Sequence, residues 1–414
     1  MTTEEFIALH RNDDTKKLAL TARHDDNVDM DFALTQIDGW QRAKTKLPQW
    51  AATTGVVYPP HLSMEQCSSE CTATYKAALA QRLTNGGKAT SLTDLTGGFG
   101  VDFSFMAKGF ERACYVERNS ALCDIARHNL KVMHMDRHTT VMNAQAEEVL
   151  QTMERQTMIF IDPARRNSNG GRTFAIADCT PDVTQLRNLL LEKGELVLVK
   201  LSPMLDWRKA VADIGNCVGE VHIVAQEGEC KELLLVLSER FSKLERIFCA
   251  NGQQVFEFTP EEAQDAEQHR RFAQESRLLL PTGDVPQEEQ RYQYLYEPDA
   301  SLMKAACHAL VAQRYGLEEI APNSHLLVGD ILVEHFPGRT FALVDSTSMN
   351  KKALKAFCAP LKQANISVRN FPLKVAELRK KLQLADGGDT YLFATTLANG
   401  KRVLLKGMKV RQET

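Results

Sequence analysis

The sequence predicts an α/β protein with a mostly parallel, doubly wound sheet in its middle, a helical region before the sheet and a basic α+β region after it. Three observations support this. Apolar residues recur every three or four positions before residue 89, short apolar runs alternate with helical segments after it, and basic residues gather near the end. The chain has 414 residues, more than one hydrophobic core usually holds, so we expect several domains.

Changes in these patterns divide the chain into four segments. Residues 1–88 are expected to form a helical region, which an Asn-Gly-Gly cluster ends. Residues 89–240 form the sheet domain, residues 241–325 a hairpin followed by a ferredoxin-like segment, and residues 326–414 a basic α+β domain.

In the sheet domain we expect strands at about 90–95, 113–117, 139–142, 158–162 and 195–201. The helices between and before these strands are expected at about 102–107, 119–132, 144–153 and 181–193. The runs EVHIVAQ and KELLLVLSE follow, joined by a few turn residues. They must be antiparallel, because a parallel crossover needs a dozen or more residues. A mostly parallel sheet with an antiparallel hairpin at its C-terminal end is a Rossmann-like arrangement.

Beyond residue 240 we expect an Asn-Gly hairpin in ERIFCANGQQVFEFT, a helix over 261–275, a strand in RYQYLYEP and one helix over 300–316. The last ninety residues predict the order strand, helix, strand, helix and hairpin. This order is close to that of ferredoxin-like and RNA-binding sandwiches.

Charge is distributed unevenly along the chain. Residues 349–414 contain fourteen Lys or Arg and four Asp or Glu, a net charge of +10, whereas residues 1–348 carry 36 and 49, a net charge of −13. This asymmetry predicts a polyanion-binding surface with RNA as the expected partner, and a solvated lysine-rich surface is the alternative. The residues assigned to this surface include Lys380, Lys381, Lys401 and Arg402.

Composition and termini argue against several classes of protein. The chain is 43% hydrophobic and 25% charged, and no apolar stretch approaches the ~18 residues of a membrane span. The N-terminal MTTEEFIALHRNDD is too acidic for a signal peptide, so we expect a cytoplasmic protein with free thiols. His61, Cys67 and Cys71 lack a fourth ligand, so no metal site is predicted.

The stretch LTDLTGGFGVD, residues 92–102, predicts a strand-to-helix turn that bares its backbone to a ligand, because glycine has no Cβ. Phe103 stands where the dinucleotide fingerprint needs its third glycine, and the flanking carboxylates are awkward for a pyrophosphate. The cofactor-binding residues predicted in this stretch are Asp94, Thr96, Gly97, Gly98, Gly100 and Asp102.

An acidic rim suits S-adenosylmethionine, which carries a sulfonium and an ammonium group and no phosphate. Glu117, at the end of the second strand, can accept both ribose hydroxyls, while Asn143 and the Ala144 backbone, after the third strand, can hold the adenine. Ligands of doubly wound sheets bind at this carboxyl edge. The sequence therefore predicts S-adenosylmethionine as cofactor, with NAD-dependent redox chemistry as a distant alternative.

The motifs DLTGGFGVD, YVERN, MNAQAEE and IDPARR, in this order, resemble those of class I S-adenosylmethionine-dependent methyltransferases over about residues 89–240. The segments EQCSSECTATYKA, KLSPMLD, FPLKVAELRKKL and DGGDTYLFATTLANGKRV are similar to uncharacterised bacterial methyltransferases with a ferredoxin-like segment and a THUMP-like C-terminal domain. THUMP domains of other enzymes bind RNA, often tRNA, so the resemblance implies an RNA substrate.

The fourth strand ends in the sequence DPARR, residues 162–166. Related enzymes carry Asp/Asn-Pro-Pro-Tyr here to grip an amino group, and Ala164 and Arg165 depart from that pattern. Enzymes that methylate uridine C5 carry Asp-Pro-Pro-Arg and a cysteine after the fifth strand. Ser202 and Pro203 follow that strand here in place of a cysteine, so covalent C5 chemistry is not expected unless Cys179 supplies the thiol.

We therefore expect direct in-line transfer to a nitrogen or oxygen, foremost a base nitrogen of tRNA or rRNA. Asp162 is the predicted proton acceptor and is also assigned to the cofactor-binding residues, and Lys200 is a second candidate for the proton acceptor. Arg165 and Arg166 can clamp a phosphate or carboxylate. Two alternatives stay open. One is a methyltransferase of a protein or small molecule, and the other is a non-catalytic RNA-binding protein that keeps the sheet as a scaffold.

Overall fold

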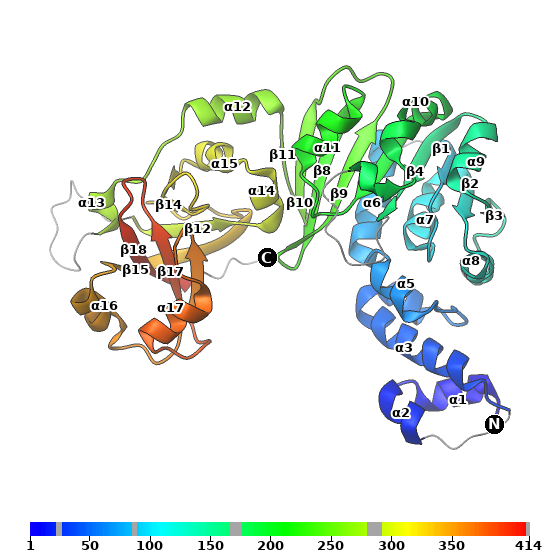
Figure 1. Cartoon of the computed structure of the whole chain (residues 1–414), viewed down its shortest axis with the longest axis horizontal. Coiled ribbons are helices and arrows are strands. Elements are labelled where there is room, and N and C mark those ends of the chain that lie inside the picture. Colours follow the sequence, from blue (N-terminus) through cyan, green and yellow to red (C-terminus); the bar gives the residue numbers. More distant parts are fainter. Residues whose placement is uncertain (22–26, 85–88, 166–175, 280–291, 411–414) are drawn as a thin grey trace. The chain divides into compact units, whose positions relative to one another are not determined.

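The computed structural model describes residues 1–21, 27–84, 89–165, 176–279 and 292–410. They form two compact units, coloured from blue to green and from green to red in Figure 1. Unit 1 comprises residues 1–226 and 231–245, and unit 2 comprises residues 227–230 and 246–414. No helix of the described ranges is long and apolar enough to cross a membrane.

The first part of unit 1 is helical, as predicted. Its helices are α1 (Thr3–His10), α2 (Thr15–Thr21), α3 (Met30–Lys46), α4 (Pro48–Ala52), α5 (His61–Gln66) and α6 (Glu70–Leu83). The side chains of Thr2, Asp29 and Ser69 accept backbone N–H groups and so cap α1, α3 and α6. Helix α6 packs against α7 (Val101–Met106), so the helical region is continuous with the sheet domain.

Unit 1 contains the predicted Rossmann-like sheet, with the strand order β8-β9-β7-β4-β1-β2-β3. Its strands are β1 (Ala89–Asp94), β2 (Phe110–Glu117), β3 (Thr139–Asn143), β4 (Gln156–Ile161), β7 (Gly194–Leu201), β8 (Val218–Gln226) and β9 (Glu229–Leu237). β3, β2, β1, β4 and β7 are parallel in succession, and β9 runs antiparallel to β7, which confirms the predicted fold class. The short strands β5 (Ala164–Arg165) and β6 (Cys179–Thr180) were not predicted.

Helices pack beside this sheet. They are α7, η1 (Ala107–Gly109), α8 (Ser120–Val132), α9 (Ala146–Thr152), η2 (Ile176–Asp178), α10 (Val183–Lys193) and α11 (Trp207–Ile214). Because the central strands are covered, their residues are apolar on both faces, and Ile159, Phe160, Val197 and Leu198 are all buried. Because β3, β2, β1, β4 and β7 are parallel, their carboxyl ends lie at one edge of the sheet.

Unit 2 contains a second sheet, with the strand order β13-β14-β12-β15-β18-β17-β16. Its strands are β12 (Tyr294–Pro298), β13 (Glu318–Glu319), β14 (Leu327–Gly329), β15 (Gly338–Ser348), β16 (Asn365–Arg369), β17 (Thr390–Thr396) and β18 (Arg402–Lys409). The other elements are the hairpin of β10 (Arg246–Asn251) and β11 (Gln254–Phe258), with α12 (Pro260–Gln268), α13 (Glu275–Leu278), α14 (Ala300–Ala305), α15 (His308–Tyr315), α16 (Lys351–Cys358) and α17 (Val375–Leu382). The division of the chain at residues 88, 240 and 325 stays a prediction.

Two helix predictions in unit 2 were wrong in extent. The helix expected over 261–275 covers residues 260–268, and the one expected over 300–316 is divided into α14 and α15. Ala306 ends α14 in the left-handed region, with φ 54°. Ala305 and Cys307 are both buried, whereas in one continuous helix they would point about 200° apart. The break therefore lets both side chains enter the core.

Candidate active site

The glycine turn lies between β1 and α7, and each glycine has its own reason to be there. Gly98 and Gly100 have φ values of 54° and 86°, in the region that glycine adopts readily. Gly97 lies against the Tyr115 ring, where an added Cβ would stand 2.1 Å from Cε2. Packing requires the first glycine, and backbone conformation requires the other two.

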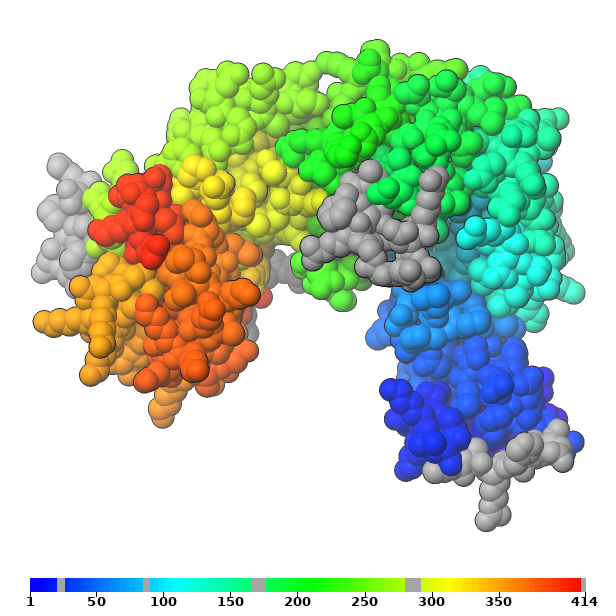
Figure 2. Space-filling view, viewed as in Figure 1, coloured from blue at the N-terminus to red at the C-terminus, as the bar shows by residue number. Residues whose placement is uncertain are grey.

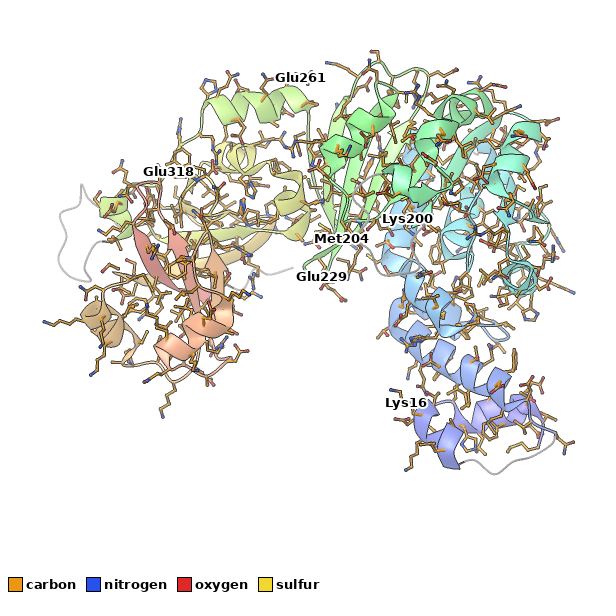
Figure 3. The ribbon with its side chains drawn as sticks, in the orientation of Figure 1. Lys16, Lys200, Met204, Glu229, Glu261 and Glu318 are labelled. Atoms are coloured by element: carbon orange, nitrogen blue, oxygen red, sulfur yellow. The ribbon has the colours of Figure 1, made fainter. Side chains whose placement is uncertain are left out.

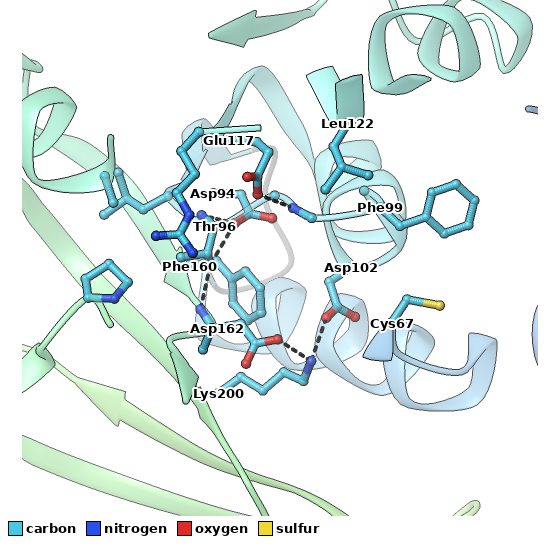
Figure 4. A pocket seen from close by; sticks show the side chains of 18 of the residues that line it. Cys67, Asp94, Thr96, Phe99, Asp102, Glu117, Leu122, Phe160, Asp162 and Lys200 are labelled. Atoms are coloured by element: carbon cyan, nitrogen blue, oxygen red, sulfur yellow. Dashed lines mark hydrogen bonds and ion pairs between the residues drawn. The ribbon is translucent and has the colours of Figure 1, made fainter. Parts of the chain in front are cut away.

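Glu117, labelled in Figure 4, ends β2, and two backbone amides fix its carboxylate. Its Oε2 accepts the N–H of Gly98 at 3.1 Å, and its Oε1 accepts the N–H of Asn119 at 2.8 Å. The carboxylate therefore lies directly beside the glycine turn.

Thr96 connects the ends of β1 and β4. Its backbone N–H donates to Oδ1 of the buried Asp94 at 2.9 Å, and its hydroxyl accepts the backbone N–H of Asp162 at 2.7 Å. Burial raises the pKa of Asp94 well above its usual range, although the hydrogen bond from Thr96 opposes the shift. One threonine thus couples the glycine turn to the DPARR motif.

Lys200 lies near the end of β7 (Figure 3) and reaches toward Asp162 and Asp102 (Figure 4). Its Nζ donates to Asp162 Oδ2 at 2.5 Å and lies 3.5 Å from Asp102 Oδ2. Desolvation raises the pKa of Asp162, and Lys200 only partly offsets it. Desolvation also favours neutral Lys200, but the carboxylates of Asp162, Asp102 and Glu232 outweigh it and raise the pKa of Lys200 well above its usual range. The pair presents a fixed cation beside a carboxyl group of raised proton affinity.

These groups share a cavity of about 250 Å³ at the carboxyl edge of the sheet. Its lining includes the glycine turn, together with Asp94, Asp102, Glu117, Ala144, Asp162 and Lys200. Most of the predicted site residues therefore come together in one recess, because parallel strands bring their carboxyl ends to one edge.

Asn143 does not line this cavity. Its side-chain amide donates to the carbonyl oxygens of Glu117, at 2.9 Å, and Arg118, at 3.0 Å. The N–H of Ala144 also donates to the Glu117 carbonyl, at 3.2 Å. Asn143 and Ala144, the two residues predicted to contact the adenine, thus both form hydrogen bonds with the end of β2. Of the two, Ala144 lines the cavity and Asn143 does not.

Of the two arginines of the DPARR motif, Arg165 falls within the described residues. The backbone of Arg165 pairs with Cys179 in the small β5–β6 ladder. Arg166 lies outside the described residues. The predicted clamp by these arginines therefore stays a prediction.

Sequence reasoning missed one wall of the cavity, which the segment around α5 supplies through Ser63, Gln66, Cys67 and Ser68. The Ser68 hydroxyl donates to Asp102 Oδ2 at 2.7 Å. The sequence assigned this segment to a separate helical region, and a local pattern of small polar residues gives no signal for a contact 34 positions away. Tertiary packing alone makes these residues part of the site.

Two family models match the C-terminal part of the chain, a ferredoxin-like domain over residues 294–337 and a THUMP domain-like model over residues 338–407. A solved structure described as a "putative methyltransferase from Porphyromonas gingivalis W83" is 33% identical. The match covers 99% of this chain and 100% of that chain, with a TM-score of 0.80.

Other solved structures match parts of the chain. The "putative methyltransferase yhhF from Escherichia coli" is 16% identical over 42% of this chain and 90% of its own, with a TM-score of 0.31. The "putative RNA methyltransferase PH1948 from Pyrococcus horikoshii" is 15% identical over 37% and 70%, with a TM-score of 0.28. No curated protein matches the chain. The full-length match shows that this chain belongs to the methyltransferase family of the Porphyromonas gingivalis protein, with ferredoxin-like and THUMP-like domains at its C-terminal end.

Proposed function

We propose that this methyltransferase uses S-adenosylmethionine and acts on RNA. The observation that carries the proposal is the single cavity that joins the glycine turn, the Glu117 carboxylate and the pair of Asp162 and Lys200. A cofactor site and a site for proton transfer would then share one recess, as a direct transfer requires.

The residues present fit this cofactor. Glu117 lines the cavity and can exchange its bond to Gly98 for bonds to ribose hydroxyls. Among described atoms, the nearest to a Cβ built on Gly98 is the Thr96 carbonyl oxygen, 3.8 Å away, so space beside the turn is open. Asp94 and Asp102 give the recess carboxyl groups suited to a sulfonium and an ammonium. When bound, the cofactor would supply an electrophilic methyl group.

The THUMP-like region supports RNA as the substrate. Helices α16 and α17, drawn in orange in Figure 2, carry five exposed lysines, which are Lys351, Lys352, Lys355, Lys380 and Lys381. Lys401 of the predicted surface instead forms an ion pair with Glu275, while Arg402 is exposed. Clustered cations of this kind bind polyanions through their phosphates.

Calorimetric titration with S-adenosylmethionine, S-adenosylhomocysteine and NADH tests the cofactor. We expect binding of the first two and none of NADH. In Gly98→Val, a β-branched residue at φ 54° distorts the turn and should abolish binding. Gly109→Val is the matched control, because no described atom lies within 4 Å of a Cβ there and Gly109 lies outside the cavity lining.

Thermal melting must show that both variants fold. If Gly98→Val does not fold, Glu117→Ala replaces it, with an expected loss of affinity of about 10-fold or more. Binding of NADH, or of none of the three compounds by the folded wild-type protein, would contradict the proposal.

A further inference from the structure

A row of charged side chains, alternately acidic and basic, leads from the cavity wall into the interior of unit 1. Asp162 contacts Lys200, which contacts Asp102 at 3.5 Å. The other oxygen of Asp102 lies 3.1 Å from the Nζ of Lys76, which also donates to both carboxylate oxygens of Glu232. We call these five side chains the charge relay. It connects α6, α7, β7 and β9 to the end of β4.

The inner part of the charge relay is fully enclosed. The Lys76 side chain has no exposed surface, and that of Glu232 is 3% exposed. Buried charges are costly unless paired, so Lys76 is held between two carboxylates. Burial favours a raised pKa for Asp102, but Lys76, Lys200 and the Ser68 hydroxyl outweigh it and lower that pKa. Asp102 therefore stays ionised beside Lys200.

Only the outer end of the charge relay can act on a substrate. Asp162, Lys200 and Asp102 line the cavity, whereas Lys76 and Glu232 do not. The carboxylates of Asp162 and Asp102 keep Lys200 cationic, and desolvation raises the proton affinity of Asp162. The cavity thus offers a cation and a proton acceptor whose nearest atoms are 2.5 Å apart.

The pair of Lys200 and Asp162 favours one class of methyl acceptor over another. A nitrogen acceptor attacks through a lone pair and gains positive charge, which a neighbouring ammonium opposes. A hydroxyl oxygen must lose a proton and gains negative charge, which an ammonium stabilises in a desolvated site. A fixed cation next to a proton acceptor suits the hydroxyl.

We infer that the methyl acceptor is a hydroxyl group, which in RNA means a ribose 2′-hydroxyl. The inference rests on the proposed function and differs from the base nitrogen expected from the sequence. The hydroxyl oxygen attacks the methyl carbon, a C–O bond forms, the C–S bond breaks, and its electron pair stays on sulfur as a neutral thioether. The hydroxyl proton passes to Asp162, and Lys200 remains protonated. Lys76 and Glu232 are positioning residues, which act through Asp102 and Lys200.

The test uses the full chain, radiolabelled S-adenosylmethionine and total RNA from cells that lack this protein, so that acceptor positions are unmethylated. Labelled RNA is digested to nucleosides and analysed by mass spectrometry. We expect 2′-O-methylnucleosides, and alkaline hydrolysis should leave the label in alkali-resistant dinucleotides. Label in a base-methylated nucleoside would overturn the inference and leave the proposed function standing. No label in RNA would overturn both.

Variants separate the roles of the residues. Lys200→Met should lower the rate of transfer about 100-fold or more with cofactor affinity nearly unchanged, whereas Lys200→Arg, which keeps the cation, should retain part of the rate. Glu232→Gln should shift the pH profile of the rate, which a purely structural role would not do. Lys131→Met, exposed on α8, is the control. An unchanged rate in folded Lys200→Met would overturn the inference.

Discussion

The Nζ atom of Lys200 lies 2.5 Å from Oδ2 of Asp162, so β4 and β7 share an ion pair at the edge of the sheet. The register of the two strands explains this ion pair. Ile161 pairs with Val199, so the residues that follow them, Asp162 and Lys200, lie side by side. Parallel neighbours in register bring residues 38 positions apart into contact.

Lys76→Met should lower the free energy of unfolding by about 3–5 kcal/mol, because it leaves Asp102 and Glu232 buried without their shared cation. Urea denaturation of wild type and variant measures the loss. Adding Glu232→Gln should recover part of it, since one buried charge is then removed. A loss no larger than that of exposed Lys131→Met would contradict this account.

Gly97→Ala should destabilise unit 1, because its Cβ would stand 2.1 Å from the buried Tyr115 ring. We expect a loss of about 1–3 kcal/mol, typical of overpacking, measured by denaturation. Gly109→Ala is the control, since no described atom lies within 4 Å of its Cβ. Equal losses in the two variants would show that the ring does not restrict this position.

Unit 2 should lose stability on acidification through His308. Burial, with His325 and Arg270 nearby, lowers the pKa of His308 to about 3. In the unfolded chain this imidazole binds a proton near pH 6.5, whereas in the folded protein it stays neutral until about pH 3. The contribution of His308 to the free energy of unfolding is therefore complete above about pH 6.5 and is lost progressively as the pH falls toward 3.

The fall in melting temperature from pH 7.5 to pH 5.0 measures this effect. It should be smaller in His308→Leu than in wild type, whereas His269→Gln, at an exposed position, should behave as wild type. An equal fall in all three proteins would assign the pH dependence to other groups.

The double variant Lys380→Glu/Lys381→Glu should weaken RNA binding and reduce its salt dependence, because fewer phosphates would be neutralised. Fluorescence anisotropy with labelled tRNA at several salt concentrations measures both. Lys16→Glu/Lys17→Glu makes the same charge change on α2 in unit 1 (Figure 3). If both double variants weaken binding equally, net charge rather than the THUMP-like region governs it.

The sequence by itself determined the Rossmann-like sheet and the place of the glycine turn. Both follow from local signals: continuous apolar runs specify buried parallel strands, and glycines specify a turn with positive φ. Residues that end successive parallel strands, such as Asp94, Glu117 and Asp162, must then meet at one edge. No knowledge of distant contacts was needed.

Tertiary structure alone decided the rest of the site. Ser68 and Lys76 lie in the helical region that precedes the strand-end motifs, and they reach Asp102 because α6 packs against α7. The break at Ala306 likewise depends on which side chains the core of unit 2 accepts. Side-chain contacts between distant segments depend on packing geometry, which local periodicity does not encode.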